Sequence, residues 1–159
     1  MNISEELLPI VTRYTQDVPV KLGALATALG IHVFKSTLKP GISGLIEPSD
    51  DSPSGYQIKI NRHEPVERQR FTLAHEISHF ILHRFEIGPG LIDDTLYRSK
   101  LSDRKEVEAN KLASQIVMPS SAINAEFALV THLEASEKIE VLAKKFRVSK
   151  EAMRIRLGY

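Results

Sequence analysis

The chain has 159 residues, of which 42% are hydrophobic and 26% charged, the composition expected of a soluble globular protein with one sizeable core. It contains no cysteine, which excludes disulfides and thiolate metal sites and makes a reducing cytoplasm the expected location. The formal net charge of +1 implies no global attraction to nucleic acid, and no stretch predicts a membrane span or a secretory signal.

Two short helices are predicted in the first 30 residues. Ser4, followed by two acidic residues, is a suitable cap for a helix that runs to about Thr15. A second helix is expected after Pro19 and ends at Gly30, since glycine commonly follows a helix C-terminus. Apolar residues at helical spacing give this second helix a core face, namely Leu22, Leu25, Ala26 and Leu29.

Between residues 31 and 61 the pattern becomes that of β-strands. Residues 31–34 and 56–60 alternate between apolar and polar, residues 42–46 are short and β-like, and residues 47–55 form a loop by composition. A small three-stranded sheet is therefore predicted. The strand at 56–60 has two interpretations of about equal weight: a plain structural strand, or a sheet edge that binds an extended peptide by strand addition.

The rest of the chain is expected to be helical, at residues 65–83, 103–118, 120–128, 134–146 and 149–157, with a loop at 84–101. Tyr97 in this loop could stabilise an oxyanion, but an ordinary half-buried tyrosine is favoured, so it is left out of the predicted site. The predicted class is α+β, a single, mostly helical domain over residues 1–159. Its parts are N-terminal helices (1–30), a small sheet (31–61), two helices that bear the candidate site (65–118) and C-terminal helices (119–159).

The most informative motif is His75-Glu76-x-x-His79, within the apolar helix predicted at 65–83. On a helix His75 and His79 share a face one turn apart, so that their imidazole nitrogens can bind one zinc ion. Glu76 lies about 100° around the helix, where it can take a proton from a water at the metal. Two core histidines satisfied by hydrogen bonds are the alternative, but a metal would satisfy all three buried polar groups at once. The motif therefore predicts a zinc metallopeptidase site.

A catalytic zinc site needs a third protein ligand, and the helix at 103–118 offers Glu106 and Glu108. Glu106 lies about 60° from the centre of the apolar face of this helix, and Glu108 lies farther away. Asn110, one turn after Glu106, could orient a ligating carboxylate. We favour Glu106 as the ligand, while the alternatives are Glu108 or a pair of solvated acids that favour the first turns of a helix.

His83 continues the histidine spacing by one more turn, but it lies about 12 Å along a straight helix from His75. One ion cannot bind His75, His79 and His83 together, because no Gly or Pro before Gly88 breaks the helix. We interpret His83 as a helix-end residue near the negative pole of the helix dipole, and a supporting role around the ligands is the alternative.

Three stretches of the sequence resemble the ImmA/IrrE family of small metallopeptidases. One is residues 68–83, and another is Ser43-Gly44 together with residues 55–61. The remaining stretch is Glu106-x-x-Ala109-Asn110-x-x-Ala113-x-x-x-x-Met118-Pro119, in which Leu112 stands where the family usually has Phe. The resemblance covers about residues 20–120 and implies a zincin-like fold. It also implies that His75, His79 and Glu106 bind zinc, with manganese as the alternative ion, and that Glu76 is the catalytic carboxylate.

The resemblance implies a function as well. Known members of the family cleave or inactivate transcriptional repressors with helix-turn-helix domains, in mobile-element control, stress responses or toxin–antitoxin-like pairs. The expected function is therefore that of a zinc-dependent endopeptidase whose partner is a protein substrate, a repressor of this kind. The alternatives are a non-catalytic regulator that binds a repressor or DNA without cutting, and a zinc toxin with a neighbouring antitoxin.

Residues 139–157 predict two helices joined by a tight turn, which is similar to the helix-turn-helix of DNA-binding proteins. Its basic residues are Lys144, Lys145, Arg147, Lys150, Arg154 and Arg156. Entry into a DNA major groove is one interpretation, and recruitment of a protein partner is another. We favour a structural hairpin, because a lone motif of this kind is weak and the chain as a whole is not basic. The residues expected to pack on the rest of the chain are Leu142, Val148, Met153 and Leu157.

Overall fold

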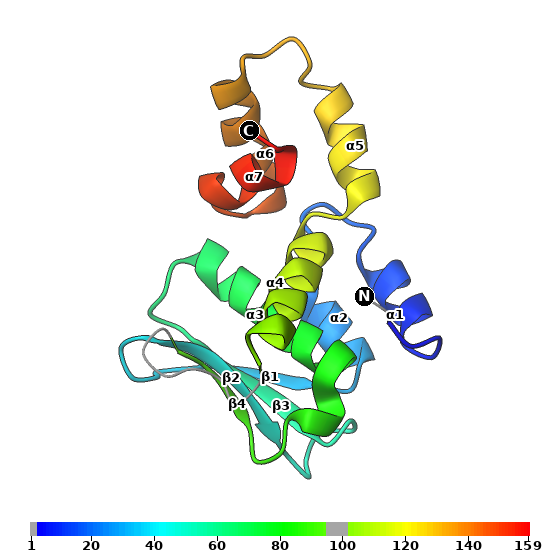
Figure 1. The fold of residues 1–159 in the computed structure, drawn as a ribbon, viewed down its shortest axis with the longest axis vertical. Helices are drawn as coiled ribbons and strands as arrows, with labels where there is room; N and C mark the ends of the chain where they lie inside the picture. Colours follow the sequence, from blue (N-terminus) through cyan, green and yellow to red (C-terminus); the bar gives the residue numbers. More distant parts are fainter. Residues whose placement is uncertain (1–2, 95–101) are drawn as a thin grey trace.

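The computed structural model describes residues 3–94 and 102–159, and its order of elements confirms the α+β class (Figure 1). The helices of the described residues are α1 (Leu8–Tyr14), α2 (Leu22–Ala28), α3 (Val66–His83), α4 (Asp103–Val117), α5 (Ser120–Ala128), α6 (Ala135–Phe146) and α7 (Lys150–Leu157), with a 3-10 turn η1 (Arg84–Glu86) after α3. The strands are β1 (His32–Ser36), β2 (Ile42–Pro48), β3 (Tyr56–Asn61) and β4 (Leu91–Asp94).

The sheet contains four strands in the order β1-β3-β2-β4, which corrects the prediction of three. The additional strand, β4, lies within the stretch 84–101 that the sequence predicts to be a loop. It has only two apolar residues, Leu91 and Ile92, and it pairs antiparallel with β2 through Ile46 and Leu45. A strand this short shows no clear alternation, so that only its pairing with a strand distant in the sequence identifies it.

The position of β3 decides between the two interpretations of that strand. It pairs parallel with β1 on one side and antiparallel with β2 on the other. Both of its edges are therefore hydrogen-bonded within the sheet, and no edge remains to which a peptide strand could be added. The expectation of peptide binding by β3 is wrong, and the plain structural strand is correct.

Helix α3 lies against one face of the sheet and contacts β2 and β3, while α4 packs on α3 (Figure 1). The close approach of β2 to α3 depends on Gly44. A Cβ atom at this position would lie 2.7 Å from Thr72 Cγ2 on α3 and 2.9 Å from the carbonyl oxygen of Lys59. Thr72 is close to one turn before the histidine motif, so the sheet fixes the position of the helix that carries the candidate site.

Helix α2 contacts α3 and α1 contacts α2, but α1 starts later than predicted. It begins at Leu8 instead of at Ser4, and no side chain caps it. Pro9 explains the difference, because proline has no amide hydrogen and is favoured in the first turn of a helix. Helix α2 agrees with its prediction: Gly30 has a φ of +77° after the helix end, and the four apolar residues predicted for its core face are buried.

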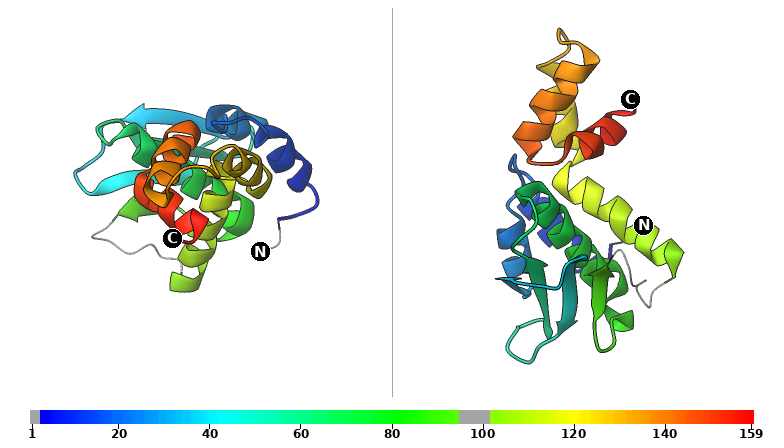
Figure 2. Two further views of the ribbon diagram at one scale, coloured as in Figure 1. Left: turned by 90° about the horizontal axis from the view of Figure 1, so that it is seen from above. Right: turned by 90° about the vertical axis from the view of Figure 1, so that its left-hand side faces the viewer.

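The C-terminal hairpin lies at the end of the molecule opposite the sheet (Figure 2). Its helices α6 and α7 are joined through Arg147, whose φ of 56° is left-handed. Leu142, Phe146 and Met153 have no exposed surface, and Val148 is also buried. The hairpin therefore has the buried apolar face that a structural role requires. Nearly all buried apolar residues of the described part of the chain form one cluster that runs from Leu7 to Met153, while the single-domain organisation stays a prediction.

Within the described residues, no helix is both long and apolar enough to cross a lipid bilayer.

Candidate metal centre

The histidine motif lies in the buried part of α3, between the sheet and α4. His75, Glu76 and His79 have exposed fractions of 5%, 1% and 1%. Their apolar neighbours Ala74 and Ile77 are fully buried, so the polar side chains are held within the core. Burial of three titratable side chains on two helical turns is costly unless their charges and hydrogen-bonding groups are satisfied.

The second helix contributes Glu106 from its first turn. Ser102 caps α4, since its Oγ accepts a hydrogen bond from the Lys105 amide at 3.4 Å. Lys105 also forms an ion pair with Glu86 in η1, which ties the start of α4 to the end of α3. These contacts set the position from which the Glu106 side chain reaches α3.

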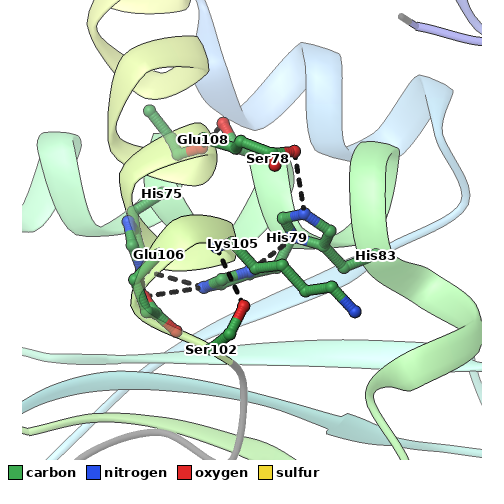
Figure 3. Close-up of polar contacts among 9 residues, drawn as sticks. His75, Ser78, His79, His83, Ser102, Lys105, Glu106 and Glu108 are labelled. Carbon is green, nitrogen blue, oxygen red and sulfur yellow. Dashed lines mark hydrogen bonds and ion pairs between the residues drawn. The ribbon is translucent and has the colours of Figure 1, made fainter. Parts of the chain in front are cut away.

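The side chains of His75, His79 and Glu106 point toward one another (Figure 3). The two Nε2 atoms of the histidines are 3.0 Å apart. Glu106 Oε2 lies 3.2 Å from His75 Nε2 and 3.3 Å from His79 Nε2. The structure thus brings together three predicted residues from two helices, and these three side chains could hold one metal ion.

The spacing of these atoms fits a small, tetrahedrally coordinated cation. Donor atoms located about 2.0–2.1 Å from a tetrahedral zinc ion lie about 3.3 Å from one another. The three measured separations of 3.0, 3.2 and 3.3 Å are close to this value. Two imidazole nitrogens and one carboxylate oxygen are also a donor set typical of zinc, and they leave the fourth position for water or substrate.

The electrostatic environment favours a neutral His79. Burial lowers the pKa of His79 below its usual value, and the positive charge of a protonated His75 would lower it further, although a hydrogen bond with Glu106 acts in the opposite direction. A neutral imidazole has a nitrogen lone pair available to a metal, whereas a protonated imidazole has none. The fold therefore maintains His79 in the form that binds metal.

Glu76 directly follows His75 on α3 and is almost completely buried. It does not belong to the group of donor atoms formed by His75, His79 and Glu106. This agrees with the separate role that the sequence predicts for it, although that role remains a prediction. Tyr97, which the sequence analysis left out of the site, lies outside the described residues.

The two acidic residues that compete for the ligand role on α4 have different surroundings. Glu106 faces the histidine pair, whereas Glu108 Oε2 lies 3.6 Å from His83 Nε2. Glu108 is thus not purely solvated, as one of the alternatives had it, and this contact could not be found without knowing how α3 and α4 pack. Asn110 is exposed on α4, and its suggested role in orienting Glu106 remains a prediction.

The basic residues of the C-terminal hairpin mostly have acidic or carbonyl partners. Lys144 and Lys150 lie 3.8 and 3.9 Å from Glu140 Oε1. Lys145 forms an ion pair with Glu126. Two arginines of the hairpin also have partners. Arg154 donates to Glu151, and Arg156 donates to Ser120 and to the Met118 carbonyl. This pairing reduces the positive charge that the hairpin presents to a partner.

Both the sequence and the fold are similar to those of known proteins. Residues 26–158 match the Peptidase_M78 family model, described as the IrrE N-terminal-like domain. Among solved structures, a Mycobacterium tuberculosis transcriptional regulator has a similar fold, with a TM-score of 0.57 and 15% sequence identity. The similarity covers 98% of this chain and 48% of the regulator, so this chain spans about half of that protein. No curated protein matches the sequence. Because the family model covers most of its length, the chain belongs to the Peptidase_M78 (IrrE N-terminal-like) family.

Proposed function

We propose that this protein is a zinc-dependent endopeptidase that cleaves or inactivates a helix-turn-helix transcriptional repressor. The observation that carries the proposal is the convergence of His75, His79 and Glu106 beside the buried Glu76. These are the three ligands and the one carboxylate that metal-assisted hydrolysis of a peptide bond requires. Membership of a peptidase family gives the same chemistry independent support.

The residues of the chain divide the chemical work between them. A zinc ion held by His75, His79 and Glu106 would supply the Lewis acidity that polarises a carbonyl group and acidifies water. Glu76 accepts the proton of the attacking water as general base, and it then delivers that proton to the leaving amine nitrogen as general acid. Its burial keeps the carboxylate away from bulk water, so that the proton passes between the attacking water and the leaving amine.

The substrate part of the proposal rests on resemblance. The family resemblance in the sequence implies repressors as substrates, and one structure with the same fold bears the name of a transcriptional regulator. Zinc is the proposed ion, with manganese as the alternative, and the cytoplasm is the proposed location because the chain has no cysteine. A scissile bond must be extended to reach the metal, so we expect cleavage in a linker or a locally unfolded segment.

The alternative is a non-catalytic regulator that binds a repressor or DNA. Direct DNA binding through α6 and α7 receives little support, because most of the basic side chains there are paired with neighbouring groups. A toxin with a neighbouring antitoxin is a biological variant of the peptidase. Growth arrest on expression that Glu76→Gln abolishes would identify this variant.

Two measurements test the proposal. Zinc content is determined by mass spectrometry on protein purified without chelator or added metal, for the parent chain and for His79→Ala. Purified helix-turn-helix repressors from the same genome are then incubated with the parent and with Glu76→Gln, and fragments are identified by mass spectrometry. We expect about one zinc ion per parent chain, little in His79→Ala, and cleavage by the parent alone.

Two results would contradict the proposed function or its mechanism. One is a parent chain that binds no zinc even after the ion is added back. The other is a Glu76→Gln variant that cleaves as fast as the parent, because hydrolysis would then not depend on the proposed base. The first result would make the regulator without catalytic activity the better explanation, whereas the second would show that the mechanism through Glu76 is wrong.

A further inference from the structure

His83 is the last residue of α3 and lies one turn beyond His79. It is buried, with an exposed fraction of 5%. Its Nδ1 atom is 3.1 Å from His79 Nδ1, and the two rings are tilted by 49° (Figure 3). The ring of His79 is thus contacted on both sides, by His75 and Glu106 at Nε2 and by His83 at Nδ1.

With a metal bound at His79 Nε2, this contact would fix the position of two protons. A hydrogen bond between two imidazole nitrogens needs one N–H group and one lone pair. A neutral His79 that offers the lone pair of Nε2 to a metal must carry its proton on Nδ1. His79 Nδ1–H therefore donates to His83 Nδ1, and a neutral His83 in turn carries its own proton on Nε2.

The Nε2–H group of His83 points to α4. Its nitrogen lies 3.6 Å from Glu108 Oε2, within ion-pair range although longer than a hydrogen bond. The other oxygen of the Glu108 carboxylate is 3.4 Å from Arg104 Nε. Only 34% of the Glu108 side chain is exposed, so the carboxylate is held between the buried histidine and an exposed arginine.

We propose that His83 and Glu108 are positioning residues that hold His79 in the Nδ1–H tautomer and orient its Nε2 atom toward the metal. This inference rests on the proposed metal site. It gives the two glutamates of α4 complementary roles: Glu106 approaches His79 at Nε2 directly, and Glu108 acts on Nδ1 through His83. Outer partners of this kind typically change metal affinity about 10–100-fold when removed.

The substitution at His83 has to separate a hydrogen-bonding role from simple packing. His83→Leu keeps a side chain of similar bulk, but the new side chain is apolar and offers no hydrogen-bond acceptor to His79. His83→Asn places an amide oxygen near the position of the original Nδ1 and can accept the same hydrogen bond. Glu108→Gln removes the negative charge next to His83 while keeping the shape of the side chain. Glu108 is also more exposed than His83. His132→Leu is the control, since His132 is exposed and distant in sequence from both helices.

The experiment measures the zinc dissociation constant of the full chain by competition with a chelator of known affinity. It also records the visible absorption spectrum after cobalt substitution, which reports the ligand geometry, and checks folding of each metal-free variant by circular dichroism. We expect zinc affinity to fall about 10–100-fold in His83→Leu with a changed cobalt spectrum, to recover largely in His83→Asn, and to fall less in Glu108→Gln. His132→Leu should match the parent.

The inference is overturned if His83→Leu binds zinc and cobalt as the parent does, or if His83→Asn is as weak as His83→Leu. The second result would mean that the loss of zinc affinity comes from altered packing and not from a missing hydrogen bond. If His83→Leu does not fold, an unchanged zinc affinity and cobalt spectrum in Glu108→Gln contradict the inference instead. If the parent chain itself does not bind zinc, the proposed function fails. That result differs from one in which the parent binds zinc and the substitutions at His83 have no effect.

Discussion

The helix pair α3–α4 and the hairpin α6–α7 both carry sequence motifs with a functional interpretation, but their polar residues have different surroundings. In α3–α4, two buried histidines meet a carboxylate from a distant part of the chain, with separations of 3.0–3.3 Å. In α6–α7, the basic residues lie on the exposed side and mostly pair with acids of the same or a neighbouring helix. The buried face of the hairpin is apolar, with Leu142 and Phe146 fully enclosed.

This difference shows when a short motif is informative. Burial makes unsatisfied polar groups costly, so a cluster of buried ligands needs an explanation that exposed charges do not need. Exposed ion pairs are worth little and occur on most helical surfaces. The two regions should therefore respond differently to substitution, and four predictions, from the largest expected effect to the smallest, test this.

The largest effect is expected from a matched pair of substitutions in α3–α4. Glu106→Gln should reduce bound zinc from about one ion per chain to a small fraction, because the third ligand loses its charge. Glu76→Gln should retain zinc and reduce the rate of cleavage by about 10²–10⁴-fold, because only the proton transfer is lost. Metal analysis and cleavage rates on both variants check this. Loss of zinc in Glu76→Gln would show that the two carboxylates do not have separate roles.

The next largest effect concerns the buried face of the hairpin. Phe146→Ala should lower the free energy of unfolding by about 3–5 kcal/mol, since a fully buried aromatic ring leaves a cavity. Zinc binding should remain, because Phe146 is not among the residues that converge on the metal centre. Urea unfolding followed by circular dichroism, together with zinc analysis of the folded variant, measures both quantities. Little loss of stability would mean that the hairpin contributes less than its burial implies.

A smaller effect is expected where the sheet supports α3. Gly44→Ala should destabilise the protein by about 1–3 kcal/mol, because the added Cβ would lie 2.7 Å from Thr72 Cγ2. Gly23→Ala is the matched control, since a Cβ there meets nothing within 4 Å and alanine favours a helix. Thermal unfolding of the two variants compares them. Equal stabilities would contradict the argument that β2 positions α3 by close contact.

The smallest effect is expected on the exposed side of the hairpin. A double variant with Lys144→Ala and Lys150→Ala should leave binding to a random-sequence DNA duplex unchanged, because both lysines lie near Glu140. Fluorescence anisotropy at low and moderate salt measures the affinity and its salt dependence. Tight binding by the parent that weakens steeply with salt, and is lost in the double variant, would favour the DNA-binding interpretation.

Much of the fold was predictable from local patterns. The alternation at residues 31–34 and 56–60 corresponds to β1 and β3, and the predicted helices correspond to α3 through α7 within one or two residues at their ends. The errors arose where local rules compete or are too short to be read. Pro9 determines the start of α1 in place of Ser4, and β4 is recognisable only through its pairing with β2.

The sequence by itself determined the family, through the match of residues 26–158 to its model, and it contained the histidine motif. It also determined the α+β class, because helical and strand periodicities are local properties of the chain. It also favoured Glu106 over Glu108 from the apolar face of α4. Only the tertiary structure decided that β3 lies inside the sheet, that Glu106 reaches the two histidines, and that Glu108 contacts His83. These three facts depend on how distant segments pack against one another, and no periodicity within a single segment encodes that packing.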